Sequence, residues 1–486
     1  MRNTPACFLL ALMSLFAVVS HAQKPVKNLN KAKTDAIADI SSQYDKYKGI
    51  ALQIWDYAEL GYKEVKSSAL LQQTLKDKGF TVEAGVAGIP TAFVATYGSG
   101  SPVIAVLAEF DALPGLTQQA VPEKKAAEGR SSGHGCGHHL FGTASVAAGI
   151  EIKELMEKGL FKGTIKVYGC PAEEGGSGKV YMVREGLFNN VDAVIHWHPG
   201  DENTTTYDGA LANKSAKFRF HGISAHASAS PERGRSALDG VEAMDNMVNM
   251  MREHIPSETR IHYVITNGGK APNVVPDFAE VYYYSRHPSR EVVKDIFERI
   301  RKAGEGAAIG TETKMDFEII GGTYDLLLNT SLAKLMQANL EQVGGFSYTD
   351  AEKTFGQSIQ STLGFKAPDI ANAGKVKPLK KTENAAMGST DVGDVSWTVP
   401  TVGMSAATWV PGTPAHSWQA VSAGGTEIGT KGMMVAAKAM TLTAIDLFMV
   451  PSNITAAKAE FDQSRGPDFK YVPLLGDRKP ALNYRD

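Results

Sequence analysis

The segment TIKVYGCPAEEGGSGKVYMVRE, residues 164–185, contains a strand pattern, a glycine-rich acidic turn and a helix pattern in direct succession. We predict a strand over 164–168 and a helix near 179–185. The alternation continues on both sides, with strand patterns at 91–96, 103–108 and 193–195 and helical patterns at 35–58, 65–79 and 139–158. Strands that alternate with helices are typical of an α/β fold with a mixed, largely parallel sheet and helices on both faces.

Polar side chains follow three of these predicted strands at the point where each ends. Glu109 and Asp111 follow the strand predicted at 103–108, Glu173 and Glu174 follow the one at 164–168, and His198 follows the one at 193–195. Because the carboxyl ends of parallel strands meet at one edge of a sheet, we expect these side chains to lie close together.

A cysteine and histidines stand between glycines in GHGCGHH, residues 133–139, just before a predicted helix. A glycine-rich turn with incidental histidines is the alternative, but Glu173, Glu174 and His198 weaken it. Thiolate, imidazole and carboxylate ligands together suit zinc or another divalent transition metal. His416, in PGTPAHS, adds a further imidazole late in the chain.

The adjacent carboxylates of Glu173 and Glu174 would repel each other unless a cation or a shared proton compensates their charge. One carboxylate can bind a metal ion while its neighbour takes a proton from the metal-bound water. That division of roles is what metal-assisted hydrolysis requires.

The pattern changes between residues 216 and 321, where strand and helix signals follow the order β-α-β-β-α-β. This order is typical of a ferredoxin-like α+β domain. We therefore predict an inserted lid or dimerisation domain at 216–321 that divides the catalytic domain into 23–215 and 322–450. The polar, proline-bearing residues 451–486 are expected to form a tail that wraps the fold.

The composition excludes some classes of protein. The chain has 486 residues, 43% of them hydrophobic, and a formal net charge of −2. A disordered chain would have low hydrophobicity and high net charge. A nucleic-acid-binding protein would have an excess of basic residues, which is missing here.

Residues 1–22 have the pattern of a cleaved signal peptide, with Arg2 before an apolar run and Ser20-His21-Ala22 as the cleavage site. The run is shorter than the roughly 20 residues that span a membrane, which argues against an anchor. We expect a periplasmic or secreted protein. The apolar stretch 424–450 contains charged residues, so we expect an amphipathic helix packed on the core and no membrane span in the mature chain.

Two cysteines, Cys136 and Cys170, remain after removal of the leader. We interpret Cys136 as a metal ligand and Cys170 as a buried thiol. A disulfide between them is the competing interpretation in an oxidising compartment, and it would abolish the metal site.

Several longer motifs carry a resemblance to a known family. They are AEFDALPG (108–115), GHGCGHHLFG (133–142), PAEEGGSGK (171–179), HWHPG (196–200), AHASASPERGRSALDGVE (225–242), PNVVPD (272–277), GSTDVGDVSW (388–397) and PGTPAHSW (411–418). The sequence resembles the di-metal aminoacylase/carboxypeptidase family, in its amidohydrolase branch with a cysteine ligand.

The resemblance implies two divalent metal ions, zinc or manganese, with Cys136 bridging them. The implied ligands are Cys136, His138, Glu174, His198 and His416. It also implies that Glu173 is the general acid/base. His226, on the inserted domain, would reach the active site of the other protomer in a dimer and polarise the scissile carbonyl. A homodimer is therefore expected, or a heteromer with a related chain.

Four further residues have weaker assignments. Asn273 and Arg286 could bind the carbonyl and the carboxylate of the substrate, although a surface ion pair is the alternative for Arg286. Asp111 either orients a ligand histidine or caps a strand end. His139 occupies the position where relatives have Asp or Asn, so we expect it to lie in the second shell of the metal site.

We expect hydrolysis of an amide that joins an acyl or aroyl group to an amino acid, a small-molecule substrate. A secreted metallo-dipeptidase or carboxypeptidase would use the same site on peptides. The third interpretation is an exported protein that binds a carboxylated ligand without turnover. The presence of Glu173 beside Glu174 argues against that interpretation.

Overall fold

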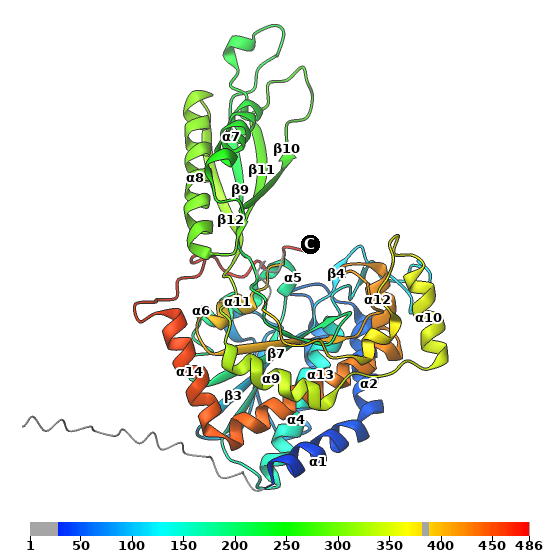
Figure 1. The fold of residues 1–486 in the computed structure, drawn as a ribbon. Helices are drawn as coiled ribbons and strands as arrows, with labels where there is room; N and C mark the ends of the chain where they lie inside the picture. Colours follow the sequence, from blue (N-terminus) through cyan, green and yellow to red (C-terminus); the bar gives the residue numbers. More distant parts are fainter. Residues whose placement is uncertain (1–27, 382–387, 486) are drawn as a thin grey trace, which may run out of the picture.

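The computed structural model describes residues 28–381 and 388–485, and the predicted leader at 1–22 lies outside them. Two large β-sheets organise the described chain, and a third sheet has only two short strands. Figure 1 shows the smaller sheet with its two helices projecting from the larger α/β part. The candidate site lies in the larger part.

The larger sheet has seven strands in the order β1-β2-β6-β3-β7-β13-β8. Its strands are β1 Thr81–Ala84, β2 Phe93–Gly98, β3 Val103–Glu109, β6 Thr164–Cys170, β7 Ala193–Gly200, β8 Thr204–Thr206 and β13 Thr401–Ala407. The neighbours β6, β3, β7 and β13 pair in parallel, whereas β1, β2 and β8 pair antiparallel at the two sides. The prediction of a mixed, largely parallel sheet is confirmed.

Strand β3 shows why helices cover both faces of this sheet. Successive side chains of a strand point to opposite faces of the sheet. One hydrophobic cluster therefore contains Ile104, Val106 and Ala108, and another contains Ala105 and Leu107. The first cluster includes α4 (His138–Glu157) and α13 (Glu427–Met449), and the second includes α6 (Gly178–Arg184) and α11 (Val392–Ser396). A strand that is buried on both faces has a continuous apolar sequence, as β3 has.

The smaller sheet has four strands in the order β10-β11-β9-β12, all antiparallel. Its elements are β9 Ala212–His221, α7 Ala237–Met251, β10 Arg260–Asn267, β11 Phe278–His287, α8 Arg290–Gly310 and β12 Lys314–Thr323. Both helices pack on one face, where alternate β11 residues such as Val281 and Tyr283 are buried. The predicted ferredoxin-like domain is confirmed.

The predicted helix over 35–58 is wrong, because two helices meet at Gln43. They are α1 (Leu29–Ser42) and α2 (Tyr44–Tyr57). Helix α1 packs mainly on α13, whereas α2 packs mainly on α4. The break lets two apolar faces contact different helices of the core.

The C-terminal region also differs from expectation. Helix α13 is buried around most of its circumference and is not amphipathic; it is long and apolar enough to span a membrane, but 89% of that stretch is buried inside the fold. It is a core helix. Residues 451–465 form helix α14 (Pro451–Arg465), so only the chain from 466 onward follows the fold as an extended tail.

The remaining helices surround this frame. They are α3 Val65–Lys76, α5 Glu173–Gly176, α9 Thr330–Val343, α10 Asp350–Gln360 and α12 Trp418–Gly424. Short strands β4 (Leu113–Pro114) and β5 (Ser132–Gly133) pair just before α4 and fix the approach of the chain to it.

Candidate metal centre

The candidate ligands converge at the carboxyl ends of the parallel strands. Cys136 and His138 lie at the start of α4, Glu174 follows β6, and His198 lies near the end of β7. His416 comes from the segment after β13, where its backbone N–H donates to the carbonyl of Gly135. The sheet order therefore brings together residues that are far apart in the sequence.

The five ligand side chains form two groups that share one thiol. Cys136, His138 and His198 offer one set of donor atoms, and Cys136, Glu174 and His416 offer the other. Within each group the donor atoms lie within 4.8 Å of one another. The Cys136 Sγ is 3.4 Å from Nε2 of His198, and Nε2 of His416 is 3.0 Å from Oε1 of Glu174.

The hydrogen bonds of the histidines leave the right atoms for metal ions. Nδ1 of His138 is bonded to Oδ1 of Asp111 at 2.9 Å, and Nδ1 of His198 lies 2.7 Å from the carbonyl of Pro199. The buried atoms Nε2 of His138 and Oε1 of Glu174 make no well-directed hydrogen bond, although they lie 3.1 Å from Oε2 of Glu109 and 3.0 Å from Nε2 of His416. Buried polar atoms without partners are costly, and a bound cation would satisfy them. The donor set fits divalent transition metals.

Burial and the neighbouring His138 lower the pKa of His198 to about 4. This ring is therefore neutral at neutral pH. The pKa values of His138 and His416 are instead raised, because Asp111 outweighs burial at His138 and Glu174 contacts His416, so these two rings would release protons when a metal ion binds. Burial raises the pKa of the Cys136 thiol, although His138 opposes that effect. A divalent cation would favour its thiolate form.

Asp111 lies behind two candidate ligands at once. Its Oδ1 contacts Nδ1 of His138, and its Oδ2 accepts a hydrogen bond from the backbone N–H of Glu174 at 2.9 Å. Asp111 is therefore placed to orient a candidate ligand histidine, because its carboxylate fixes both the ring and the acidic turn.

Contrary to expectation, His139 does not lie where it could orient a candidate ligand. Its ring lies 4.8 Å from the ring of His134, and its Nε2 donates to the carbonyl of Gly424 at 3.0 Å. The helix directs successive residues to different faces, so His139 points into the core while His138 points to the site. Burial lowers the pKa of His139, which keeps the ring neutral.

Glu173 adjoins the ligand groups. Its carboxylate lies with Glu109 and His138 in a third set of donor atoms within 4.8 Å. Burial raises the pKa of Glu173 well above its usual range, and the charges of Glu109 and Glu174 add to this effect. A carboxyl group with a raised pKa beside a metal site is suited to accept and return a proton.

Lys179 is a residue whose role the sequence did not reveal. Its fully buried Nζ lies 2.6 Å from Oε1 of Glu109 and 2.6 Å from Oδ1 of Asp391. The lysine neutralises acids that would otherwise be left uncompensated next to the metal centre. Its place in PAEEGGSGK was the only signal in the sequence.

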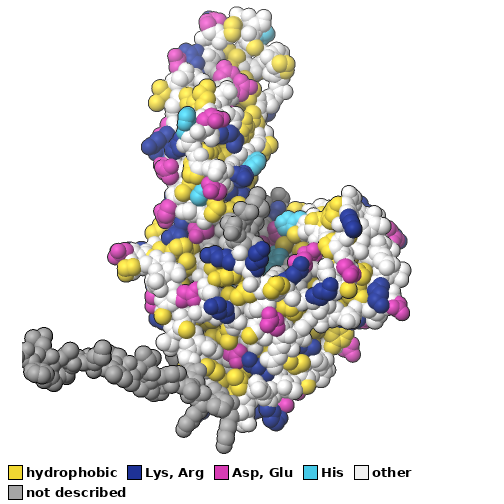
Figure 2. Space-filling view, in the orientation of Figure 1, with side chains coloured by type: hydrophobic (Ala, Val, Ile, Leu, Met, Phe, Trp, Pro, Cys, Tyr) yellow, Lys and Arg dark blue, Asp and Glu magenta, His cyan; other side chains and the backbone are white. Residues whose placement is uncertain are grey.

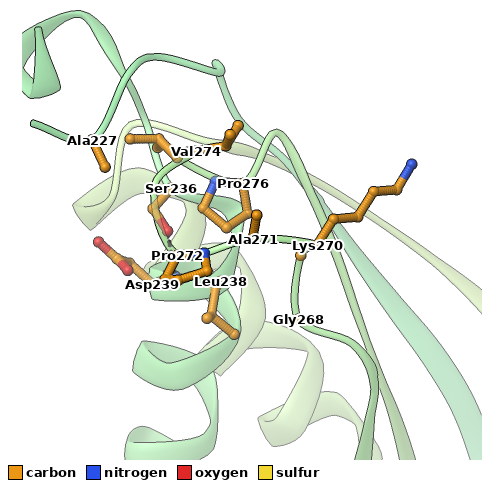
Figure 3. Close-up of a pocket in the computed structure, with 12 residues that line it drawn as sticks. Ala227, Ser236, Leu238, Asp239, Gly268, Lys270, Ala271, Pro272, Val274 and Pro276 are labelled. Carbon is orange, nitrogen blue, oxygen red and sulfur yellow. Dashed lines mark hydrogen bonds between the residues drawn. The ribbon is translucent and has the colours of Figure 1, made fainter. Parts of the chain in front are cut away.

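The inserted-domain candidates lie away from these ligands in the same chain. His226 and Asn273 are exposed, and they belong to the β9–α7 and β10–β11 loops at the end of the inserted domain farthest from the catalytic part (Figure 1). The loops meet through the bridge between His226 and Val274. They surround a cavity of about 480 Å³ whose lining residues all come from the inserted domain, Ala227, Ser236 and Lys270 among them (Figure 3).

Arg286 lies on β11, on the sheet face without helices. It lines a cavity of about 690 Å³ together with Arg260, Tyr282 and Tyr284. Its guanidinium lies 5.3 Å from the centre of the Tyr284 ring. The predicted substrate residues Asn273 and Arg286 are therefore not brought to the ligands within one chain.

Cys136 and Cys170 are both free thiols, so the disulfide interpretation is wrong for this fold. Cys170 is fully buried and its Sγ donates to the carbonyl of Tyr168.

A cavity of about 620 Å³ opens beside His198. Its lining includes Glu109, the threonines 204–206, Lys377 and Lys380. Figure 2 shows basic side chains gathered with histidines on this face, at the foot of the inserted domain. A small anionic molecule could enter next to the candidate ligands.

Comparisons with known proteins agree with this geometry. The chain is 41% identical over 471 residues to one of the p-aminobenzoyl-glutamate hydrolase subunits of Escherichia coli (strain K12), covering 91% of this chain and 97% of that protein. Residues 212–310 match the peptidase dimerisation domain of M20 proteins. The chain belongs to the M20 family of hydrolases.

Other known proteins resemble the chain more distantly. The Xaa-Arg dipeptidase of Mus musculus is 28% identical over 448 residues, covering 89% of this chain and 93% of that protein. The YXEP protein of Bacillus subtilis, described as a dinuclear metal binding peptidase of the M20 family, has the same fold with a TM-score of 0.58 and 16% identity, over 84% of this chain and 99% of that chain. The prediction of an amide-cleaving hydrolase is confirmed, and a binding protein without activity is not supported.

Proposed function

We propose that this M20 hydrolase cleaves the amide between an aroyl or acyl group and an amino acid, with p-aminobenzoyl-glutamate as the first substrate to test. The observation that carries the proposal is the 41% identity over 97% of a p-aminobenzoyl-glutamate hydrolase chain. The partly buried Glu173 beside the two ligand groups supplies the acid/base that this reaction needs.

The proposed cofactor is a pair of divalent ions, zinc or manganese. Cys136 would be shared, His138 and His198 would hold one ion, and Glu174 and His416 would hold the other. When bound, such ions lower the pKa of a coordinated water and polarise the carbonyl that it attacks.

The protein groups would carry the proton transfers. The Glu173 carboxylate takes a proton from the attacking water and then delivers it to the nitrogen of the leaving amino acid. Because the His226 loop lies far from the ligands of its own chain, the imidazole is proposed to act on the carbonyl oxygen in the partner's active site.

A dimer through the inserted domain is part of the proposal. Strand β10 is at the edge of its sheet and exposes Tyr263, Val264 and Ile265, and helix α7 exposes Met247 and Met250. An exposed apolar edge strand is suited to pair with another chain. A second copy is the simplest partner. A related chain is the alternative, since a different component of the same E. coli hydrolase is 27% identical over 312 residues, covering 53% of this chain and 71% of that protein.

We also propose that the protein is exported, on the basis of the leader pattern in residues 1–22. Expression of the full chain followed by N-terminal sequencing of the periplasmic fraction tests this. A mature N-terminus near Gln23 would support export, and an uncut cytoplasmic chain would contradict it.

The function is tested with the purified mature chain, after metal analysis. Release of free amine is measured for p-aminobenzoyl-glutamate, for N-acyl amino acids and for dipeptides, each with and without a chelator. Preferred, chelator-sensitive cleavage of the aroyl or acyl amino acids supports the proposal. Cleavage confined to dipeptides would instead favour a dipeptidase, the second candidate, which the similarity to the Xaa-Arg dipeptidase supports.

A further inference from the structure

The turn that carries Glu173 and Glu174 has an irregular backbone. Ala172, Gly175 and Ser177 have positive φ angles of 56°, 94° and 59°, and Glu174 has a ψ of 65°. Such a turn cannot satisfy its own peptide groups as a regular helix does. Its shape must therefore be fixed by side chains from other parts of the chain.

Acidic side chains hold the N–H groups of this region. The N–H of Ala172 donates to Oε1 of Glu64 at 2.8 Å, and that of Glu174 donates to Oδ2 of Asp111 at 2.9 Å. Both acids lie on segments that precede the turn by more than 60 residues. They fix one side of the turn only, because a carboxylate cannot hold a carbonyl group.

The carbonyl groups are held by two tyrosines and an arginine. The Tyr62 hydroxyl donates to the carbonyl of Gly176 at 2.6 Å. The carbonyl of Glu174 accepts two hydrogen bonds, from the Tyr484 hydroxyl at 3.1 Å and from Nη2 of Arg485 at 2.6 Å. The backbone of a candidate metal ligand is thus clamped from the C-terminal segment.

The segment 466–485 is anchored along its path to this turn. Tyr471 donates to Oδ1 of Asp394 at 2.7 Å, and Leu474 and Leu475 are buried. Nη1 of Arg478 then donates to the carbonyl of Ile320 on β12. Figure 1 shows this segment, in red, following the foot of the inserted domain and reaching α5.

The last contacts are closely fitted. The ring of Tyr484 lies edge-on to the ring of Tyr62, with centroids 5.5 Å apart. A side chain at Gly61 would place its Cβ 2.2 Å from the Tyr484 hydroxyl oxygen. The absence of a side chain at Gly61 therefore permits Tyr484 to reach the turn.

We infer that Tyr484 and Arg485 are positioning residues of the metal centre, which act through the carbonyl of Glu174 to set the direction of its carboxylate. The Glu174 carboxylate belongs to the ligand group with Cys136 and His416, and it is not a member of the group that contains His138 and His198. The inference rests on the proposed metal site and not on the choice of substrate. It predicts an effect on one ion more than on the other.

The experiment is a calorimetric titration of the metal-free full chain, performed once with Mn²⁺ alone and once with Zn²⁺ alone. Outer-shell changes weaken metal binding by about 10- to 100-fold. For Arg485→Ala combined with Tyr484→Phe, we expect one of the two equivalents of metal to bind at least about tenfold more weakly than in the wild type, with the other equivalent unchanged. Arg485→Lys should recover part of the loss, because lysine supplies one charged donor in place of the guanidinium fork.

The controls separate positioning from a general loss of structure. Within the double variant, Tyr484→Phe keeps the ring that packs on Tyr62, so the packing of the segment is retained. Val472→Ala is the matched control: it changes an exposed side chain elsewhere in the same segment, and this variant should bind both ions normally. Kinetics use whichever substrate the wild type cleaves, and we expect kcat to fall with KM nearly constant.

Two results would overturn the inference. One is unchanged binding of both metal equivalents in the double variant. The other is a rise in KM at constant kcat, which would make Arg485 a substrate anchor. Failure to cleave p-aminobenzoyl-glutamate would contradict the proposed substrate alone, since the titration contains no substrate.

Discussion

Nδ1 of His138 and Oδ1 of Asp111 lie 2.9 Å apart, with both side chains fully buried. The pairing fixes the tautomer of the histidine and directs Nε2 toward the site. Because Oδ2 of the same carboxylate holds the N–H of Glu174, one side chain sets the geometry of both ligand groups.

Asp111→Asn should therefore weaken metal binding by about 10- to 100-fold and lower activity in parallel. The amide keeps the size of the side chain but removes the charge that orients the imidazole. Metal content after dialysis against a graded chelator measures the effect. Asp316→Asn, in an exposed pair with His221, is the control and should retain its metal. Normal metal content in Asp111→Asn would remove Asp111 from the site.

Glu173→Gln should keep its metal and lose about 10²- to 10⁴-fold in kcat, because the amide cannot take the proton. Metal analysis and steady-state kinetics on the same preparation test both halves of this prediction. Glu185→Gln, just after α6, serves as the control. Turnover close to that of the wild type would show that Glu173 is not the acid/base.

Lys179→Met should destabilise the fold by about 3–5 kcal/mol, because it leaves Glu109 and Asp391 buried without a counter-charge. Chemical denaturation measures the free energy of unfolding. Lys158→Met is the matched control: its ion pair with Asp39 is exposed, so it should change stability by no more than about 1 kcal/mol. Equal effects of the two substitutions would mean that the buried lysine does not compensate the acids.

The sequence predicted the parts of the site that follow from local pattern. The run Val103–Ala108 indicated a strand buried on both faces. Glu109 and Asp111 come directly after this run, so they were expected at the carboxyl end of that strand. Parallel pairing then placed the turn with Glu173 and the histidine His198 beside them. Alternation and the strand-end rule were sufficient here, because they need no knowledge of tertiary packing.

The parts of the site that the sequence did not predict depend on contacts between distant segments of the chain. Nothing local indicates that Tyr484 and Arg485 return to Glu174, because the tail has no periodic pattern. The buried role of Lys179 requires Asp391, which is 212 residues away. The direction of His139 was missed because neighbouring residues of a helix face different surroundings, and sequence position alone does not say which face meets the site.

Glu151 gives a prediction for the pH dependence of stability. Burial raises the pKa of this α4 carboxyl from 4.5 to about 7, and the charges of Asp39 and Glu154 add to the shift. The unfolded chain releases this proton near pH 4.5 while the folded chain retains it until about pH 7. The contribution of Glu151 to stability is therefore lost as the pH rises through this window.

Glu151→Gln replaces the ionisable carboxyl with an amide and so removes this pH-dependent loss of stability. Its melting temperature should exceed that of the wild type increasingly from pH 5 to pH 7, with a constant difference above about pH 7 and little difference near pH 4. Glu298→Gln breaks an exposed pair with Arg301 in the inserted domain and should show no such gain. A difference that is independent of pH would assign the effect of Glu151 to packing.

The proposed role of His226 is tested by mixing two inactive variants. In a dimer whose sites each use the partner's imidazole, a His226→Ala chain paired with a Glu173→Gln chain contains one complete site, with Glu173 from the first chain and His226 from the second. Random exchange makes half of the dimers mixed, so about a quarter of wild-type activity should return. Each variant alone is the control, measured at the same total concentration after the same unfolding and refolding. Activity of the mixture equal to the average of the two separate variants would show that each site uses residues of one chain only. Because the His226 loop lies at the far end of the inserted domain, that result would also require a large movement of this domain toward its own metal centre.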